Sequence, residues 1–339
     1  MILLFVLGAA FGFGGLGVFL IFWPRAAMGG WLAGFVLCSG AAIGSVFALS
    51  IHALTGGRWL LAFSEIFTAS AGATPVFGLL FIPVLVFLPH FYPWLENTNP
   101  PPEGVRNLYL NTPFFIGRSV GALCFWSLLG ILLPRLDGGR KIFVGAIGLT
   151  IHAFIIGLIG VDWILSLQPE FWSSSFGATL AFTQFATALA WIAVVSPGER
   201  DAVGIGDLGG MLLATLLGLT YLNFVAFLVI WYGNIPDRVF WFSFRNRWPW
   251  PLIATLAFIF GSIVPIFSLF LERIRSSRLG MRFVGAVTLA GIALYYAYLI
   301  SPPFGALSLG AGALATVAMG CLLGALTLAP WWRRRPSGE

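Results

Sequence analysis

The stretch from Trp31 to Leu54 reads WLAGFVLCSGAAIGSVFALSIHAL and contains no charged side chain. A helix needs about 20 mainly apolar residues to cross the hydrocarbon core of a bilayer, so this stretch predicts a transmembrane helix. The same pattern recurs along the chain. Ten stretches qualify as spans: 2–22, 31–54, 73–89, 109–133, 142–163, 174–195, 207–232, 251–272, 282–300 and 306–330. The sequence therefore predicts an all-α polytopic membrane protein.

The composition supports this fold class. Of 339 residues, 59% are hydrophobic and 9% are charged, whereas a soluble domain carries about 25% charged residues. Most of the apolar surface must face lipid, so the bilayer is the first expected partner. The net charge is +6, but the basic residues stand in short runs at the ends of the spans. This arrangement is typical of membrane topology signals, and we expect no nucleic-acid partner.

Two connecting segments differ from simple loops. The segment from Arg58 to Ala71 is short for a span and contains Glu65, which predicts a helix lying in the membrane interface. The segment from His90 to Asn107 is rich in proline and aromatic residues, and we expect it to pack on the helix ends or on a partner. No separate soluble domain is visible, so residues 1–339 are expected to form a single membrane domain.

Lysine and arginine residues are distributed unequally between the two sides of the predicted bundle. Twelve lie on the side that holds both termini: Arg58, Arg135, Arg140, Lys141, Arg200, Arg273, Arg275, Arg278, Arg282, Arg333, Arg334 and Arg335. Five lie on the opposite side: Arg25, Arg106, Arg238, Arg245 and Arg247. Because positive residues concentrate in cytoplasmic loops, both termini are expected in the cytoplasm.

Polar side chains inside four consecutive spans are the first candidate functional residues. Arg118 lies a third of the way along its span, and His152 and Gln184 lie near the middle of theirs. Tyr221 and Asn223 are near the middle of the next span. Ionisable groups in a membrane are costly unless paired or hydrated, so we expect a hydrated layer inside the bundle.

A hydrogen-bonded network that only fixes helix register is the alternative interpretation of this layer. For Gln184 and Asn223 taken alone, that structural role is favoured. For Arg118 with His152 a functional role is favoured, because a buried arginine is expensive and histidine titrates near neutral pH.

Four acidic residues near span ends are candidates for the mouths of a proton path. Asp162 ends a span on the outer side, whereas Asp207 and Glu272 mark cytoplasmic ends. Glu65 lies in the predicted interfacial helix. Acids in such positions are more often solvated helix caps. A proton path needs titratable or hydroxyl groups within hydrogen-bond reach or joined by water, and these side chains are of a suitable type.

The positions of histidine and cysteine argue against a bound metal. A bis-histidine haem needs two ligands at one depth on facing helices. His152 lies near the middle of a span, while His52 and His90 lie at opposite membrane faces. The three cysteines stand alone in apolar spans without a C-x-x-C motif. We therefore expect no haem and no metal site.

Three stretches together resemble a known family. They are YLNTPFFIGR from Tyr109 to Arg118, DWILSLQPEFWS from Asp162 to Ser173, and LNFVAFLVIWYGNIP from Leu222 to Pro236. They are similar to the ActF-type subunit, a second quinone-binding-type membrane subunit of bacterial alternative complex III, which is a quinol:cytochrome c oxidoreductase. ActF belongs to the wider NrfD/PsrC-like group, and the resemblance extends over most of the chain, from the second to the ninth span.

The resemblance implies a fold and a set of partners. It implies two four-helix bundles, 31–163 and 174–300, with flanking helices at 1–22 and 306–330. It implies a subunit of the bacterial inner membrane without haem, covalently bound cofactor or redox centre. The implied partners are a sister NrfD-like membrane subunit, a periplasmic iron–sulfur subunit and c-type cytochrome subunits, with a terminal oxidase as a further candidate. Menaquinol or ubiquinol is expected in a partner subunit.

The resemblance also implies functional residues. A proton path is proposed for this family, and on matching positions it includes Arg118, Asp162, Ser166 and Asn234, with Asp207 as a weaker match. Where the family carries an acidic residue before the proline and a histidine after it, this chain has Gln168 and Glu170. The termini are also short for the family. Both departures count against proton pumping.

Two other functions remain open from the sequence. The chain is itself a quinol-binding subunit if Asp162, with Arg118, supplies a proton acceptor near the outer surface. A secondary transporter with a midplane site at broken helices is the third interpretation, although no paired repeats support it.

Overall fold

The computed structural model describes residues 2–329 apart from 58, 96–102, 170, 172, 197–201, 234 and 235. Within these residues the protein is all-α and contains no strand. Ten helical stretches are long and apolar enough to cross a membrane, which confirms the predicted fold class. The protein is therefore a multi-pass membrane protein with ten candidate spans.

Five spans are single α-helices: α1 Ile2–Phe22, α2 Pro24–Thr55, α10 Phe176–Val195, α16 Arg278–Ile300 and α17 Leu307–Leu328. A sixth, Gly204–Gly233, lies within α11 Ala202–Gly233. The other four spans are composite: η1 Leu61–Phe63 with α3 Ser64–Gly72, α4 Thr74–Leu80 and α5 Ile82–Val86; α8 Thr112–Leu132 with η3 Leu133–Arg135; α9 Gly138–Trp163 with η4 Leu165–Leu167; and α13 Trp250–Phe258 with the π-helical η5 Ile259–Ile263 and α14 Val264–Phe270. Short helices complete the fold: α6 Leu88–Phe91, η2 Pro93–Leu95, α7 Glu103–Leu108, α12 Pro236–Phe244, α15 Glu272–Arg275 and η6 Pro302–Phe304.

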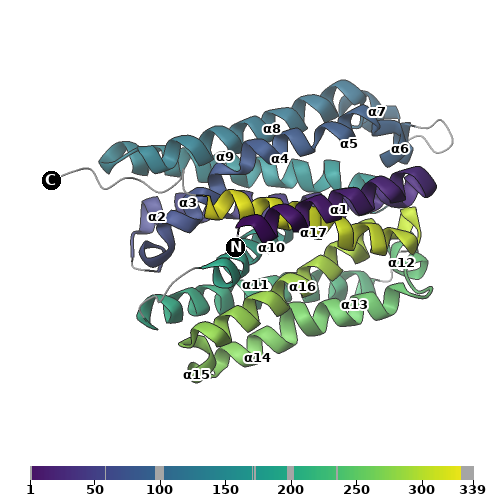
Figure 1. Ribbon diagram of the computed structural model, residues 1–339. Coiled ribbons are helices and arrows are strands. Elements are labelled where there is room, and N and C mark those ends of the chain that lie inside the picture. Colours follow the sequence, from purple (N-terminus) through teal and green to yellow (C-terminus); the bar gives the residue numbers. More distant parts are fainter. Residues whose placement is uncertain are drawn as a thin grey trace.

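The spans form two groups on either side of α2 and α10 (Figure 1). The first group packs α8, α9 and the α3–α5 span against α2. In the second group α11 and α16 pack on α10, and the α13–α14 span packs on α16 and α11. Helix α10 also contacts α2 and α9, so it joins the two groups, while α1 and α17 lie along α2. Helix α2 is consequently the most enclosed span.

Small residues allow the central helices to approach closely. Gly30 and Gly34 of α2 face Ala311 and Ala315 of α17, and Gly44 of α2 faces the backbone of α10. No larger side chain fits at these contacts, because a Cβ atom there would overlap the neighbouring helix. Close backbone approach at glycine and alanine is a typical source of helix association in membranes, where no hydrophobic effect drives the helices together.

The expectation of an interfacial helix between Arg58 and Ala71 is wrong. Helix α3 is the first part of the third span, Leu61–Val86, and its residues Ile66, Phe67 and Ser70 are buried. The error has a physical origin. Glu65 interrupts the apolar pattern, but it lies in the first turn of α3 with its side chain exposed, so no charge enters the core.

The segment after this span was expected to pack on the helix ends. Its described part contains α6, η2 and α7, and the side chains of Phe91, Tyr92 and Trp94 are buried. Tyr92 also donates a hydrogen bond to the backbone oxygen of Trp163, at 3.3 Å. This part of the segment therefore covers the ends of α8 and α9, as predicted.

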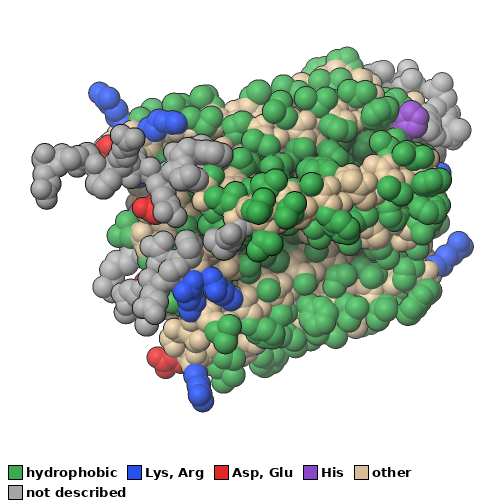
Figure 2. Space-filling view, viewed as in Figure 1, with side chains coloured by type: hydrophobic (Ala, Val, Ile, Leu, Met, Phe, Trp, Pro, Cys, Tyr) green, Lys and Arg blue, Asp and Glu red, His purple; other side chains and the backbone are tan. Residues whose placement is uncertain are grey.

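Charged side chains gather at the ends of the molecule, and the body between them is hydrophobic (Figure 2). The end that holds α15 carries most of the described basic residues, among them Arg135, Arg140, Arg273 and Arg275. We refer to it as the basic end. The opposite end holds α6, α7 and α12, and we refer to it as the loop end (Figure 1).

The contact between α2 and α17 can be tested with a single methyl group. In Gly34→Ala the new Cβ would lie 2.5 Å from the Cβ of Ala315, so the helices must separate. We expect destabilisation of about 1–3 kcal/mol, typical of overpacking. In the control Gly14→Ala no neighbouring atom lies within 4 Å, and the better helix propensity of alanine should leave stability equal or higher. The stability of both variants is measured by how much of the monodisperse size-exclusion peak remains after heating in detergent. Equal loss of the peak in Gly34→Ala and Gly14→Ala would contradict the packing argument.

Candidate functional site

An ion pair between α8 and α9 forms the centre of the site. The Nε of Arg118 donates to Oδ2 of Asp162 at 2.6 Å, and Nη2 donates to Oδ1 at 2.9 Å. Asp162 has no exposed surface, whereas 15% of the Arg118 side chain is exposed. Nη2 also donates to the backbone oxygen of Tyr109 at 2.9 Å, and the guanidinium lies 4.0 Å from the centre of the Tyr109 ring. This is a two-point, charge-assisted contact in a water-poor environment.

Local structure places both partners near the loop end. Asn111 caps α8 by accepting a hydrogen bond from the backbone nitrogen of Phe114, and Pro113 stands in the first turn, where its missing N–H is harmless. Arg118 lies about two helical turns after Asn111, at about 3.6 residues per turn. Asp162 is the next-to-last residue of α9, and the Ser166 hydroxyl donates to its backbone oxygen at 2.6 Å.

Two tyrosines from the loop end lie close to the ion pair. Burial raises the pKa of Tyr92 well above its ordinary value, and the charge of Asp162 raises it further. Burial also raises the pKa of Tyr109, with a second contribution from Asp162 and an opposing one from Arg118. Both phenols therefore stay protonated at neutral pH and do not add negative charge to the pair.

Further polar contacts continue from the ion pair toward the middle of the membrane. The indole N–H of Trp163 donates to the Ser119 hydroxyl at 3.0 Å, and the indole N–H of Trp126 donates to Nδ1 of His152 at 3.0 Å. We call the set Arg118, Ser119, Trp126, His152, Asp162 and Trp163 the α8–α9 seam.

The hydrogen bond from Trp126 determines the tautomer of His152. Because Nδ1 accepts, the neutral ring must carry its proton on Nε2. That Nε2–H is buried and has no hydrogen-bond partner among the described residues, and the same is true of the Gln184 side-chain oxygen. The two residues are connected by aromatic contacts, since Phe47 packs on the ring of His152 and on Phe185, the neighbour of Gln184.

The seam holds two kinds of group with different chemical abilities. The carboxylate of Asp162, the hydroxyl of Ser119 and the imidazole of His152 can accept and release protons. The guanidinium of Arg118 and the indoles of Trp126 and Trp163 can only donate hydrogen bonds. The side chains of the seam therefore do not form a continuous proton relay, and Asp162 and His152 stay about 15 Å apart along α9.

The structure divides the predicted polar layer into separate positions. Arg118 pairs with Asp162 near the loop end and does not share a level with His152. Tyr221 is 65% exposed on the outer face of α11, so it does not join an interior layer. Counting residues along each span gives an approximate depth, but it does not determine which face of the helix a side chain occupies.

The remaining predicted residues are spread over the molecule. Glu65 and Glu272 are exposed near the basic end, and Asp207 is half-buried in the first turns of α11. Asn234 lies outside the described residues. In the described part of the chain, no group of three histidine, cysteine, aspartate or glutamate residues is placed to hold a metal ion.

Another arginine, Arg245, was counted in the sequence only as a topology signal, but it is buried. Arg245 is 2% exposed and donates to the backbone oxygens of Tyr298, Leu299 and Trp241, at 3.1, 3.0 and 3.2 Å. Two of these oxygens belong to the C-terminal turn of α16, where the helix dipole favours a cation. Burial lowers the pKa of Arg245 to about 9, so it stays positive at neutral pH.

Comparisons with models of known protein families and with curated protein sequences find no match to this chain. The fold and the seam define the protein as a polytopic integral membrane protein with a buried ion pair near one membrane face.

The ion pair makes a quantitative prediction for stability. Asp162→Asn leaves the charge of Arg118 without a carboxylate, and we expect a loss of about 3–5 kcal/mol. The double variant Arg118→Gln with Asp162→Asn removes both charges and should recover most of that loss. Glu272→Gln changes an exposed acid and should stay within about 0.5 kcal/mol of the parent. Unfolding in a detergent titration measures all three, and a double variant no more stable than Asp162→Asn would contradict the expected coupling of the pair.

Proposed function

We propose that this protein is a haem-free integral membrane subunit of a respiratory quinol:cytochrome c, or quinol:electron acceptor, oxidoreductase of the alternative complex III type. In this role it supports the quinol site of a sister NrfD-like subunit and contributes to a transmembrane proton path. The basic end faces the cytoplasm of a bacterial cell, and both termini lie on that side. Iron–sulfur and c-type cytochrome partners bind at the loop end.

One observation carries this proposal. Two of the three stretches that resemble ActF, 109–118 and 162–173, meet in the structure at the Arg118–Asp162 pair. Arg118 and Asp162 stand 44 positions apart along the chain, one in each stretch, and they pair in one contact. The coincidence supports a shared site rather than a chance resemblance of apolar segments.

A proton path would begin at Asp162 and pass His152 and Gln184 to the basic end near Asp207. The buried Nε2–H of His152 and the unpaired oxygen of Gln184 support it, because buried polar groups of this kind are commonly satisfied by internal water. Water is required, since the indoles of the seam cannot relay protons. Glu65 and Glu272 are candidate contacts with the cytoplasmic solvent.

The alternative that this chain itself oxidises quinol at Asp162 has less support. Both carboxylate oxygens already accept from Arg118, and the carboxylate is fully buried. A quinol hydroxyl would have to displace the arginine before Asp162 could accept its proton.

The partners are the first test of the proposal. The native complex, purified through a tag on this chain, should contain a multihaem cytochrome and an iron–sulfur subunit, detected by mass spectrometry and by haem absorbance. A stable assembly of this chain alone would overturn the proposal.

The proton path requires a second test in the assembled complex. His152→Leu should keep the complex assembled and quinol oxidation within about twofold, while the protons released per quinol decrease because a titratable group is removed. Thr150→Val, an exposed residue of the same helix, is the matched control and should change neither quantity.

The double variant Arg118→Gln with Asp162→Asn separates the two quinol interpretations. Retained oxidation supports a site in the sister subunit, whereas abolished oxidation in an intact complex would place the quinol site in this chain. If His152→Leu and the double variant both leave proton release unchanged, the proposed path is wrong and these residues have a structural role.

A further inference from the structure

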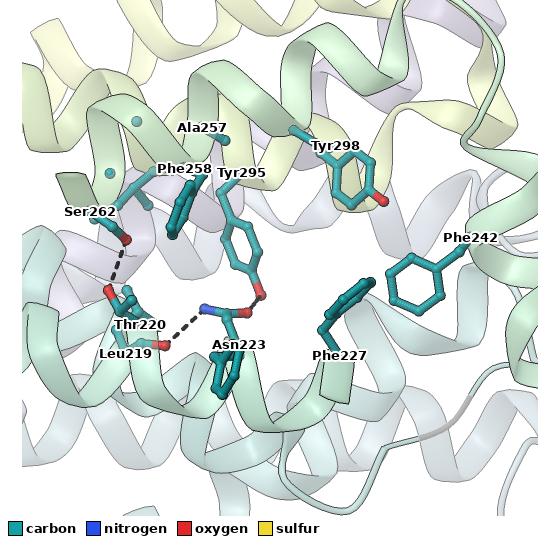
Figure 3. A pocket seen from close by; sticks show the side chains of 15 residues that line it. Leu219, Thr220, Asn223, Phe227, Phe242, Ala257, Phe258, Ser262, Tyr295 and Tyr298 are labelled. Carbon is teal, nitrogen blue, oxygen red and sulfur yellow. Dashed lines mark hydrogen bonds between the residues drawn. The ribbon is translucent and has the colours of Figure 1, made fainter. Parts of the chain in front are cut away.

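The second helix group contains a cavity of about 500 Å³. It lies between α11, the α13–η5 part of its span, and α16, and Phe242 of α12 closes it toward the loop end (Figure 3). Its volume falls within the range of about 300–1,000 Å³ that is typical of small-molecule sites. The walls are mostly apolar, and their aromatic side chains include Phe224, Phe227, Phe258 and Tyr298.

Four polar side chains gather at one end of this cavity. The Tyr295 hydroxyl donates to the side-chain oxygen of Asn223 at 3.0 Å, and the Thr220 hydroxyl donates to the Ser262 hydroxyl at 2.9 Å (Figure 3). The Asn223 amide donates one hydrogen to the Leu219 backbone oxygen at 3.0 Å. We call Thr220, Asn223, Ser262 and Tyr295 the polar cluster.

The polar cluster has hydrogen-bond donors to spare. An asparagine amide carries two N–H donors, and within the described residues only one of those of Asn223 is used. The Ser262 hydroxyl accepts from Thr220, so its own hydrogen remains available, and no described residue accepts it. Two free donors at the end of an apolar cavity suit a ligand that presents an acceptor oxygen, such as a carbonyl.

The cavity is reached from the bilayer rather than from water. Phe224, Phe227 and Phe258 line it and are also 58, 51 and 53% exposed on the outer faces of their helices. Asn223 lies ten residues before the end of α11 at Gly233, which is about 15 Å at a helical rise of about 1.5 Å per residue. This depth is near the middle of a hydrocarbon core of about 30 Å.

Local backbone geometry creates this space. The π-helical turn Ile259–Ile263 directs Ser262 and Gly261 toward the cavity, and π-helical turns occur frequently at functional sites. Gly261 packs directly on Gly291 of α16, and a Cβ atom at Gly291 would overlap the backbone of η5. The two glycines hold the helices together beside the cavity.

We propose that this cavity binds an elongated, membrane-dissolved ligand that carries a carbonyl group, with the carbonyl oxygen at Asn223 and Ser262 and the apolar part between the phenylalanines. The ring carbonyl of an isoprenoid quinone and the ester carbonyl of a lipid share this chemistry. The site is separate from the Arg118–Asp162 pair, and it does not depend on the proposed role in a respiratory complex.

The test uses the purified full-length chain in lipid nanodiscs with two photoreactive probes. One probe is an azido-quinone, and the other is a phosphatidylcholine with a diazirine in its acyl chain. Peptide mass spectrometry should locate saturable labelling on α11, α13 or α16 around the cavity, and excess decylubiquinone should compete with the quinone probe. Ala254 lines the cavity, so Ala254→Phe should fill it and reduce labelling by about tenfold or more.

Two further variants make the result specific. Asn223→Leu removes one donor and should raise the half-saturating probe concentration by about fivefold to tenfold, the effect of one hydrogen bond. Leu252→Phe is the control for Ala254→Phe. It changes an exposed residue of α13 that does not line the cavity, and labelling should not change. If Ala254→Phe does not fold, Asn223→Leu combined with Ser262→Ala tests the same site.

The identity of the labelling probe decides the source of the carbonyl. Cavity labelling by the quinone probe supports a ring carbonyl, and labelling of the same peptides by the lipid probe supports an ester carbonyl. The proposal is overturned if neither probe labels these peptides, or if labelling persists in a folded Ala254→Phe variant. Failure of the co-purification test would leave this result unaffected.

Discussion

Asp162 is a carboxylate with no exposed surface inside a membrane protein, and this places a strong constraint on the helices around it. A charge in that environment needs a partner, and removing either member of such a pair is more damaging than removing both. The bidentate contact with Arg118 holds α8 and α9 in one antiparallel register near the loop end. The contacts of Trp163 with Ser119 and of Trp126 with His152 follow from the same register. Tyr92, which is buried, and Tyr109, which is half-buried, lie close to the pair without adding charge.

The charged side chains in the two helix groups have different kinds of partner. In the first group the ion pair is fully matched, and the surrounding aromatic side chains are tightly packed. In the second group Arg245 is matched by backbone oxygens of α16 instead of a carboxylate, and a cavity lies beside it, with Tyr298 shared between the two. The first group is thus suited to holding charge at a fixed position. The second is suited to accepting a ligand from the bilayer.

Helix α2 makes the two groups into one structure. Its small residues let α17 and α10 approach closely on different faces, so the groups meet along a long interface instead of a flexible joint. Gln184 lies at this interface, where its backbone meets Gly44 of α2 and its side chain approaches Gly40. A proton path through Gln184 would therefore run between the groups and depend on how tightly α2 and α10 pack.

Much of the architecture could be predicted from the sequence, because a membrane span is a local property of about 20 apolar residues. Ten spans and the all-α class followed from that pattern. The beginning of the third span was predicted wrongly, because Glu65 interrupts the apolar pattern there. Glu65 proves to lie in the first turn of α3. Arg118, Asp162 and His152 could also be selected from the sequence, since ionisable groups in spans are rare and expensive.

Only the tertiary structure decided which of these residues meet. Arg118 binds Asp162 rather than lying beside His152, and Tyr221 faces outward, because rotation about a helix axis depends on packing between helices and not on position along one span. The cavity beside Asn223 has the same origin. It arises where a π-helical turn, two glycines and residues from three separate spans come together. The sequence of a single span does not predict such a cavity, because contacts between spans form it.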